Sequence, residues 1–191
     1  MAAARTARNQ KKAAQEGGVV LFEDECIFQQ SGSISRSWFK RGVGGEVRSK
    51  PVRRGCKVYG AVAVHGQTPK FHFRFEKDKF NAYSFVTFLE GVVRYYKGRG
   101  HRVHMIVDGA AYHKTALPWV AAHSADIELH FLPAYSPNLN AAEQLWRRAK
   151  REATHNRYFP TLESLHRAVF RRFNRWQGNP ASLRGIVQRW L

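Results

Sequence analysis

The segment VVLFED, residues 19–24, is an apolar run that ends in an acidic residue, and VHMIVD, residues 103–108, repeats this pattern. Unbroken apolar runs of this length are typical of strands that are buried on both faces of a sheet. In α/β sheets, side chains at the carboxyl ends of such strands leave the core and meet solvent, and ligands gather there. If the two strands are parallel neighbours, the carboxylates of Asp24 and Asp108 therefore converge.

The remaining periodic segments predict a mixed α/β architecture. Besides the two runs, we expect strands at 35–40, 57–65, 69–75 and 127–131, and helices at 80–97, 113–123, 139–153 and from 161 onward. Early antiparallel strands followed by alternating strands and helices favour a mixed sheet with helices packed against it. We expect four tryptophans to fill the core: Trp38, Trp119, Trp146 and Trp176.

The composition is that of a folded and strongly basic protein. Hydrophobic residues make up 43% of the 191 residues, which is enough for a sizeable core. The net charge of +18 indicates a polyanionic partner, most often nucleic acid. No apolar run reaches the length of a membrane span, and two cysteines suit a reducing compartment. We therefore expect a cytoplasmic, nucleoid-associated protein without a membrane partner.

Positive charge is concentrated in the last quarter of the chain. Residues 144–191 contain 11 Lys or Arg and only 2 acids. Surfaces that merely face solvent usually mix charges, so contact with phosphates explains this excess better, although such contacts supply affinity without base specificity. The residues expected to bind DNA are Arg147, Lys150, Arg151, Arg167, Arg171, Arg175 and His113. His113 lies five positions after Asp108, and it could instead help to order the site or be an ordinary helix residue.

Three acids are candidates for metal binding: Asp24, Asp108 and Glu143. Carboxylates that lie close together repel one another unless a cation sits between them, and Mg²⁺ prefers oxygen ligands. Each acid also has an ordinary explanation. The two aspartates can be turn residues, and Glu143 stands at capping-box spacing from Asn140.

Several motifs resemble the catalytic half of mariner-type bacterial insertion-sequence transposases, which are DDE superfamily endonucleases. They are FEDE at 22–25 with the following Trp38 and Gly42, DGAAYH at 108–113, and LPAYSPNLNAAE at 132–143. The family pattern is F-x-D-E, then D-N-x-x-x-H, then P-x-Y-S-P-x-L-N-P-x-E, and the 34 residues between Asp108 and Glu143 match its spacing. Gly109 and Ala141 replace the usual Asn and Pro. The likeness extends over about residues 19–173.

This resemblance implies a ribonuclease-H-like fold, a mixed five-stranded sheet with helices on both faces. We expect the chain to divide into a basic tail (1–17), a catalytic domain (18–158) and a basic helical extension (159–191). It also implies a catalytic, metal-binding triad of Asp24, Asp108 and Glu143 that holds two Mg²⁺ ions, with Mn²⁺ as a substitute. The implied activity is DNA strand cleavage and strand transfer, with insertion at TA dinucleotides.

The implied partners are double-stranded DNA, as element ends and target, and further copies of the chain in a homo-oligomer. Only about 18 residues precede the first strand, so a helix-turn-helix region that reads the element ends is expected upstream or on a separate chain. Two alternatives remain at this point. One is a non-catalytic DNA-binding remnant, and the other is a different ribonuclease-H-like nuclease, such as a junction resolvase or an RNA–DNA hybrid hydrolase.

Overall fold

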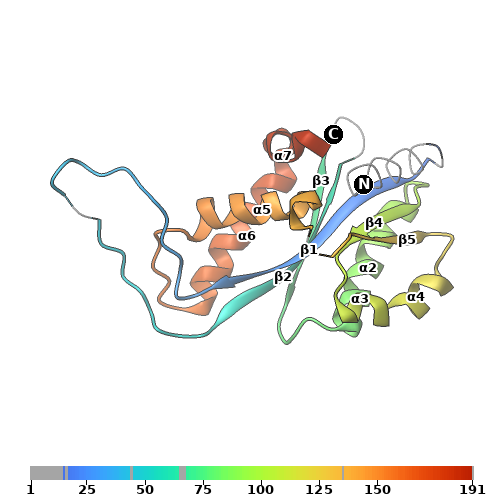
Figure 1. The fold of residues 1–191 in the computed structure, drawn as a ribbon, viewed down its shortest axis with the longest axis horizontal. Coiled ribbons are helices and arrows are strands. Elements are labelled where there is room, and N and C mark those ends of the chain that lie inside the picture. The colour runs from blue at the N-terminus through green and yellow to red at the C-terminus, as the bar shows by residue number, and fades with distance from the viewer. Residues whose placement is uncertain (1–14, 16, 44, 65–67, 135, 191) are drawn as a thin grey trace.

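A five-stranded sheet runs through the centre of the molecule in the order β3-β2-β1-β4-β5 (Figure 1). The computed structural model describes residues 15, 17–43, 45–64, 68–134 and 136–190. The strands are β1 (Val19–Gln29), β2 (Gly55–Ala63), β3 (Lys70–Glu76), β4 (Val103–Val107) and β5 (Ile127–Phe131). β1, β2 and β3 pair antiparallel, whereas β4 runs parallel to β1 and β5 runs parallel to β4. The mixed sheet is therefore confirmed, and the two apolar runs are parallel neighbours, which is the condition stated above for Asp24 and Asp108 to converge.

β1 extends further than the sequence predicts. Its parallel pairing with β4 reaches only as far as Phe22 opposite Ile106. Beyond that pair, β1 continues beside β2 alone, because Cys26 and Phe28 still fill the core. Asp24 thus lies inside β1, just past the end of the parallel ladder. The expectation that this strand ends at Asp24 is wrong.

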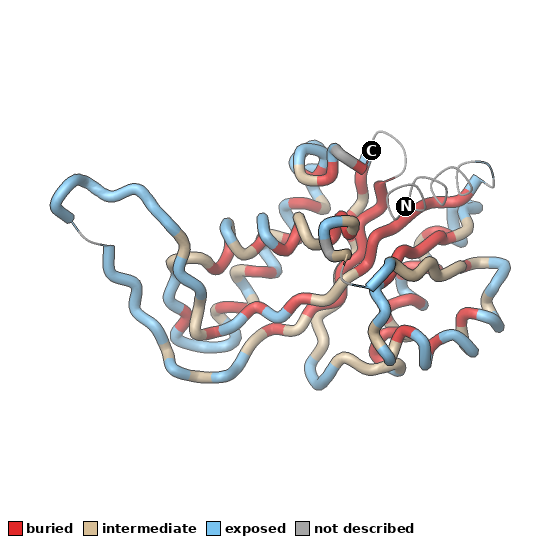
Figure 2. Tube along the Cα trace, viewed as in Figure 1, coloured by how far each residue is buried: buried red, intermediate tan, exposed pale blue. Residues whose placement is uncertain are grey.

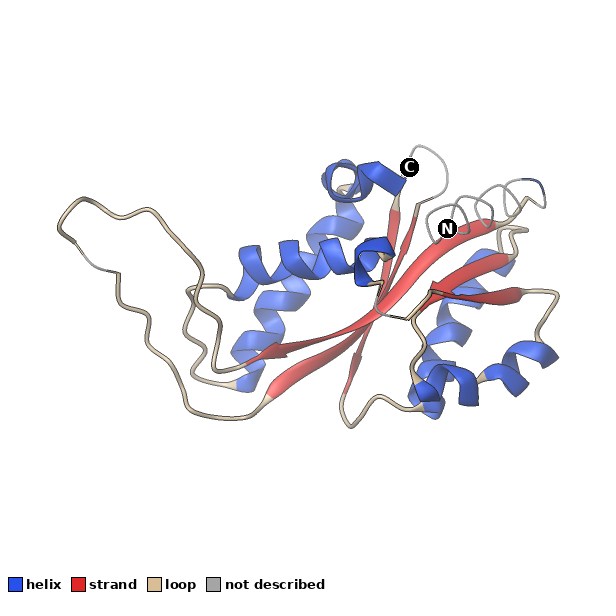
Figure 3. Cartoon of the chain, viewed as in Figure 1, coloured by secondary structure: helices blue, strands red, loops and turns tan. Residues whose placement is uncertain are grey.

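Helices cover both faces of the sheet, as predicted (Figures 1 and 3). One face carries α5 (Ala141–Ala149), α6 (Leu162–Gly178) and α7 (Pro180–Val187), and the other carries α2 (Ala82–Lys97), α3 (Ala111–Thr115) and α4 (Leu117–Ala122). Alternate residues of β1 enter the two cores: Val20 and Phe22 face α5–α7, whereas Val19 and Leu21 face α2–α4. The central strands β1, β2 and β4 are accordingly buried over most of their length, whereas the edge strands β3 and β5 are mostly half-buried (Figure 2). None of the helices in the described ranges has the length and apolar character that a bilayer crossing requires.

Two helices expected from the sequence are each divided. The 113–123 segment forms α3 and α4, and Pro118, which has no backbone N–H to donate, stands in the first turn of α4. The 139–153 segment begins with a 3₁₀ turn (Pro137–Leu139), forms α5 and ends in a π-helical turn (Lys150–Thr154). The last long helix starts as expected, because Thr161 and Ser164 form a capping box ahead of α6.

The connection between β1 and β2 is long and extends away from the sheet (Figure 1). The strand expected at 35–40 is wrong, since these residues form no strand. An isolated bridge joins Ser33 to His155, but none of the strands among the described residues pairs with the backbone of 35–40. Trp38 is fully exposed rather than buried in the core, whereas Trp146 and Trp176 are buried as expected.

Residues 159–190, set apart above as an extension, pack into the same core as the sheet. The ring of Phe173 on α6 lies 5.9 Å from that of Phe28 and 5.2 Å from that of Phe71, centroid to centroid. Leu183 and Val187 of α7 belong to the same apolar cluster. The core therefore shows no break where the sequence placed the start of this extension. Most of the expected N-terminal tail, residues 1–14 and 16, falls outside the described residues.

Candidate active site

Three acids from distant parts of the sequence line one pocket of about 380 Å³. Asp24 comes from β1, Asp108 directly follows β4, and Glu143 stands in the first turn of α5. The topology explains the meeting of the two aspartates, because each lies two residues past the last parallel pair, Phe22 and Ile106. The structure thus brings together the three acids that the sequence singled out.

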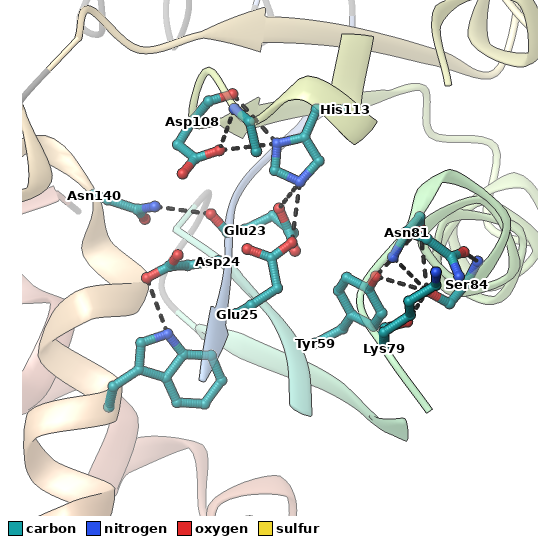
Figure 4. A network of polar contacts seen from close by, with 12 residues as sticks. Glu23, Asp24, Glu25, Tyr59, Lys79, Asn81, Ser84, Asp108, His113 and Asn140 are labelled. Atoms are coloured by element: carbon teal, nitrogen blue, oxygen red, sulfur yellow. Dashed lines mark hydrogen bonds and ion pairs between the residues drawn. The ribbon is translucent and has the colours of Figure 1, made fainter. Parts of the chain in front are cut away.

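Asp24 lies in mostly buried surroundings with negative neighbours. Burial first, and then the charges of Glu25, Glu143 and Asp108, raise its pKa to about 7, although a hydrogen bond from the Glu25 backbone N–H lowers it. The indole Nε1 of Trp146 donates a hydrogen bond of 3.1 Å to Asp24 Oδ2 (Figure 4). Trp146 thus fixes the orientation of this carboxylate without neutralising its charge.

Asp108 lies in different surroundings, with its side chain 53% exposed. Its Oδ1 lies 3.0 Å from His113 Nδ1 and accepts a hydrogen bond of 2.9 Å from the backbone N–H of Ala110. The bond to His113 lowers the pKa of Asp108; burial opposes this, and the Ala110 N–H reinforces it. Asp108 is therefore ionised at neutral pH.

His113 is enclosed by carboxylates and is fully buried (Figure 4). Its Nε2 lies 3.1 Å from Glu25 Oε1 and 3.6 Å from Glu23 Oε2. Burial lowers the pKa of His113, but the bonds to Asp108 and Glu25 outweigh it and raise the pKa to about 9. The expectation that His113 contacts DNA is wrong, because no surface of this side chain is available to a phosphate. The alternative that it orders the site agrees with these contacts.

Glu23 and Glu25 flank Asp24 but turn away from the pocket, as strand alternation predicts. Glu23 is fully buried, and its pKa is raised well above the usual value by burial first and by the charges of Glu25, Asp24 and Asp108. The chain of contacts from Glu25 through His113 to Asp108 was missed by the sequence reasoning. Its signal was the five-residue spacing of His113 from Asp108, which marked the histidine without identifying its partners.

Glu143 is positioned by the start of α5. The side chain of Asn140 accepts a hydrogen bond from the backbone N–H of Ala142, which makes Asn140 the N-cap of this helix. The other side-chain atom, Nδ2, donates a hydrogen bond of 2.8 Å to the backbone carbonyl of Glu23 in β1. Asn140 thereby ties the first turn of α5, and with it Glu143, to the strand that carries Asp24.

The basic residues expected to bind DNA lie mainly around two further surface hollows. Arg147 of α5 and Arg151 of the π-helical turn line one hollow of about 470 Å³ between α5 and α7. Arg171 and Arg175 of α6 line another of about 290 Å³, which also contains Glu152. Arg167 is exposed and pairs with Glu163 at 3.7 Å, while Lys150 is half-buried.

The acidic pocket has the chemistry of a site for a hard divalent cation. Its charged donors are carboxylate oxygens, which are the ligands that Mg²⁺ and Mn²⁺ accept. Burial first, and then repulsion from the neighbouring carboxylates, raise the pKa of Asp24, and a bound cation would relieve that repulsion. The residues present therefore fit such an ion.

Comparison with known proteins places this geometry in a family. The family model described as DDE superfamily endonuclease matches residues 19–166. No curated protein sequence matches the chain. Among solved structures, the Mos1 strand transfer complex aligns with a TM-score of 0.56 at 18% identity, covering 99% of this chain and 59% of the Mos1 chain. The Mos1 paired-end complex with the left transposon end gives 0.59 at 18% identity, covering 97% and 56%.

The catalytic domain of Mos1 mariner transposase alone aligns with a TM-score of 0.53 at 16% identity, covering 99% of this chain and 90% of that domain. The chain thus spans less than two thirds of the longer Mos1 chains but nearly the whole of their catalytic domain. At these identities the structural likeness establishes the fold, which is the ribonuclease-H-like fold expected above, and the family match establishes the relationship. The chain belongs to the DDE superfamily endonucleases.

Proposed function

We propose that this chain is the catalytic domain of a transposase that cuts DNA strands and joins them to a target with the help of Mg²⁺ or Mn²⁺. The observation that carries the proposal is the meeting of Asp24, Asp108 and Glu143, from three separate elements, in one pocket. As turn residues or caps alone, these acids would have no reason to converge. In this proposal their oxygens hold two ions.

The protein groups prepare the three acids for this role. The His113 contact and the Ala110 N–H keep Asp108 ionised, and Trp146 fixes Asp24 Oδ2. When bound, the divalent ions would promote deprotonation of an attacking water or 3′-hydroxyl and stabilise the leaving oxygen at phosphorus. Precise placement and charge neutralisation are then sufficient, and no covalent enzyme intermediate is needed.

The substrate proposed is double-stranded DNA, both element ends and target. The net charge of +18 and the arginines of α5 and α6 support it, because phosphate contacts provide most of the sequence-independent affinity for DNA. Bringing two DNA ends together requires more than one active site, so we propose a homo-oligomer on DNA. Recognition of the ends is assigned to a helix-turn-helix region, upstream or on a separate chain.

The direct experiment is a cleavage assay on supercoiled plasmid and end-containing DNA with Mg²⁺, Mn²⁺ or EDTA. We expect metal-dependent cleavage and strand-joined products from the unaltered chain, and none from Glu143→Gln. Glu163→Gln, an exposed glutamate on α6 outside the pocket, serves as the matched control and should cleave normally. Normal DNA binding without cleavage would identify a non-catalytic remnant. Symmetrical nicking of four-way junctions without joining would identify a resolvase.

A further inference from the structure

A second cluster of metal-binding side chains lies on β4 and β5, away from the acidic pocket. It consists of His104, Glu128 and His130, whose ligand atoms all lie within 4.8 Å of one another. In the parallel register His104 stands opposite Glu128, and Ile106 opposite His130. His104 lies four residues before Asp108, which is roughly 13 Å along a strand.

The three donor groups have the spacing of ligands around one ion. Nδ1 of His104 and Nε2 of His130 lie 3.2 Å apart and share a hydrogen bond, which a bound ion would replace. The carboxylate oxygens of Glu128 lie 3.8 Å from His104 Nδ1 and 3.9 Å from His130 Nε2. Ligands about 2.0–2.1 Å from a tetrahedral zinc ion are about 3.3 Å apart, so the nitrogens already fit and the carboxylate needs to move by about half an ångström.

The surroundings hold these groups in place. His104 is fully buried, and the absence of a side chain at Gly18 makes room for its ring, because a Cβ there would lie 2.7 Å from His104 Cδ2. Arg102 Nη2 lies 3.2 Å from Glu128 Oε2, a partner of the kind that orients ligating carboxylates. The other carboxylate oxygen, Oε1, is the one near His130.

We propose that His104, Glu128 and His130 bind one zinc-class divalent cation, which cross-links β5, the edge strand, to β4. Imidazole nitrogens favour Zn²⁺, Co²⁺, Ni²⁺ or Cu²⁺ over Mg²⁺, so this site selects a different metal from the carboxylate pocket. Three protein ligands leave the fourth position for water. The site does not depend on the proposed DNA chemistry.

Cobalt is the best probe, because four-coordinate Co²⁺ bound through nitrogen absorbs visible light strongly, whereas six-coordinate Co²⁺ bound through oxygen absorbs weakly. The titration uses untagged, EDTA-treated protein carrying Asp24→Asn and Glu143→Gln, so that the acidic pocket contributes little. We expect an intense visible band that saturates at one equivalent and is lost on adding Zn²⁺. Zn²⁺ should also raise the unfolding temperature by roughly 5 °C or more.

His130→Gln and Glu128→Gln are the informative variants in that background, because both side chains are partly exposed, at 12% and 30%. Each should lose the cobalt band and the zinc-dependent rise in unfolding temperature. His101→Gln, an exposed histidine just before β4, is the matched control and should retain both. Absence of the band from the parent protein, or its persistence in His130→Gln, would overturn the proposal.

Discussion

Asp24 and Asp108 follow the same sequence pattern on neighbouring parallel strands, yet their carboxylates have opposite electrostatic surroundings. Asp24 is mostly buried beside a neutral donor, Trp146, and other acids, and its pKa rises to about 7. Asp108 is half-exposed beside the protonated imidazole of His113, and its pKa falls. The strand pattern positions an acid, but the residues packed around it decide whether it carries charge at neutral pH.

The largest effect is expected from removing either carboxylate charge. Asp24→Asn and Asp108→Asn keep the side-chain size but weaken the hold on a divalent ion. Each should lower Mg²⁺-dependent DNA cleavage by on the order of 10³-fold or more, because the ions supply several kcal/mol of charge stabilisation. The cleavage rate measures this loss, and fluorescence anisotropy measures DNA affinity in the same variants. Undiminished cleavage in either variant would remove that residue from the triad.

The pH dependence of stability separates the two aspartates. The folded pKa of Asp24, about 7, exceeds its value of 3.8 in an unfolded chain, so its contribution is most favourable at low pH and is lost as pH rises from about 4 to 7. The contribution of Asp108 to stability has the opposite pH dependence, because it is lost as pH falls through its lowered pKa.

In metal-free protein, Asp24→Asn should therefore remove a decline in unfolding free energy on the order of 3 kcal/mol between pH 4 and 7. Urea unfolding at several pH values measures it. Glu163→Gln is the control, because this exposed carboxylate lies outside the pocket. An identical pH profile in Asp24→Asn and the unaltered chain would contradict the buried, raised-pKa state of Asp24.

His113→Gln tests whether His113 sets the electrostatic surroundings of Asp108. Loss of the imidazolium removes the contact that orients Asp108 and keeps it ionised, so cleavage should fall by about tenfold. The acidic limb of the pH–rate profile should move to higher pH, because the Asp108 pKa rises toward its usual value. His123→Gln, at the C-cap of α4 and bonded to the Trp119 carbonyl, is the control. Lower activity with an unmoved pH profile would reduce His113 to a packing role.

The smallest effect is expected from single arginines outside the acidic pocket. Arg171→Ala should weaken DNA binding by a few-fold, equally for all sequences, and reduce the slope of log affinity against log salt by about 1. The difference in pKa between Asp24 and Asp108 should not change in this variant. Arg94→Ala, an exposed arginine on α2 on the opposite face of the sheet, should leave affinity unchanged. Equal losses in both variants would mean that binding is not confined to the proposed surface.

The sequence predicts most of the fold because hydrophobic periodicity reflects burial directly. The apolar runs ending at Asp24 and Asp108 predicted two buried strands, and the resemblance to the transposase motifs indicated Glu143 as the third acid, which the structure places in the same pocket. The strand at 35–40 failed because a strand needs a partner, and local pattern does not show whether one is present. The prediction that Trp38 is buried was wrong for the same reason, since its exposure depends on the path of the connection between β1 and β2.

The electrostatic details of the site could not be predicted from the sequence. The burial of His113 depends on Glu23 and Glu25, which meet it only after β1 and α3 come together in the fold. The raised pKa of Asp24 likewise depends on its depth in the protein and on Glu143 from another helix. Such values arise from contacts between elements, whereas local sequence pattern reports only on each element by itself.

The central claim is that three carboxylates from separate elements hold divalent ions in one pocket. Anomalous diffraction from crystals soaked in Mn²⁺ tests it most directly. We expect anomalous density in the pocket, at roughly 2.0–2.3 Å from oxygens of Asp24, Asp108 and Glu143. Well-ordered side chains at all three positions with no anomalous density between them, at Mn²⁺ concentrations that support DNA cleavage, would contradict the claim.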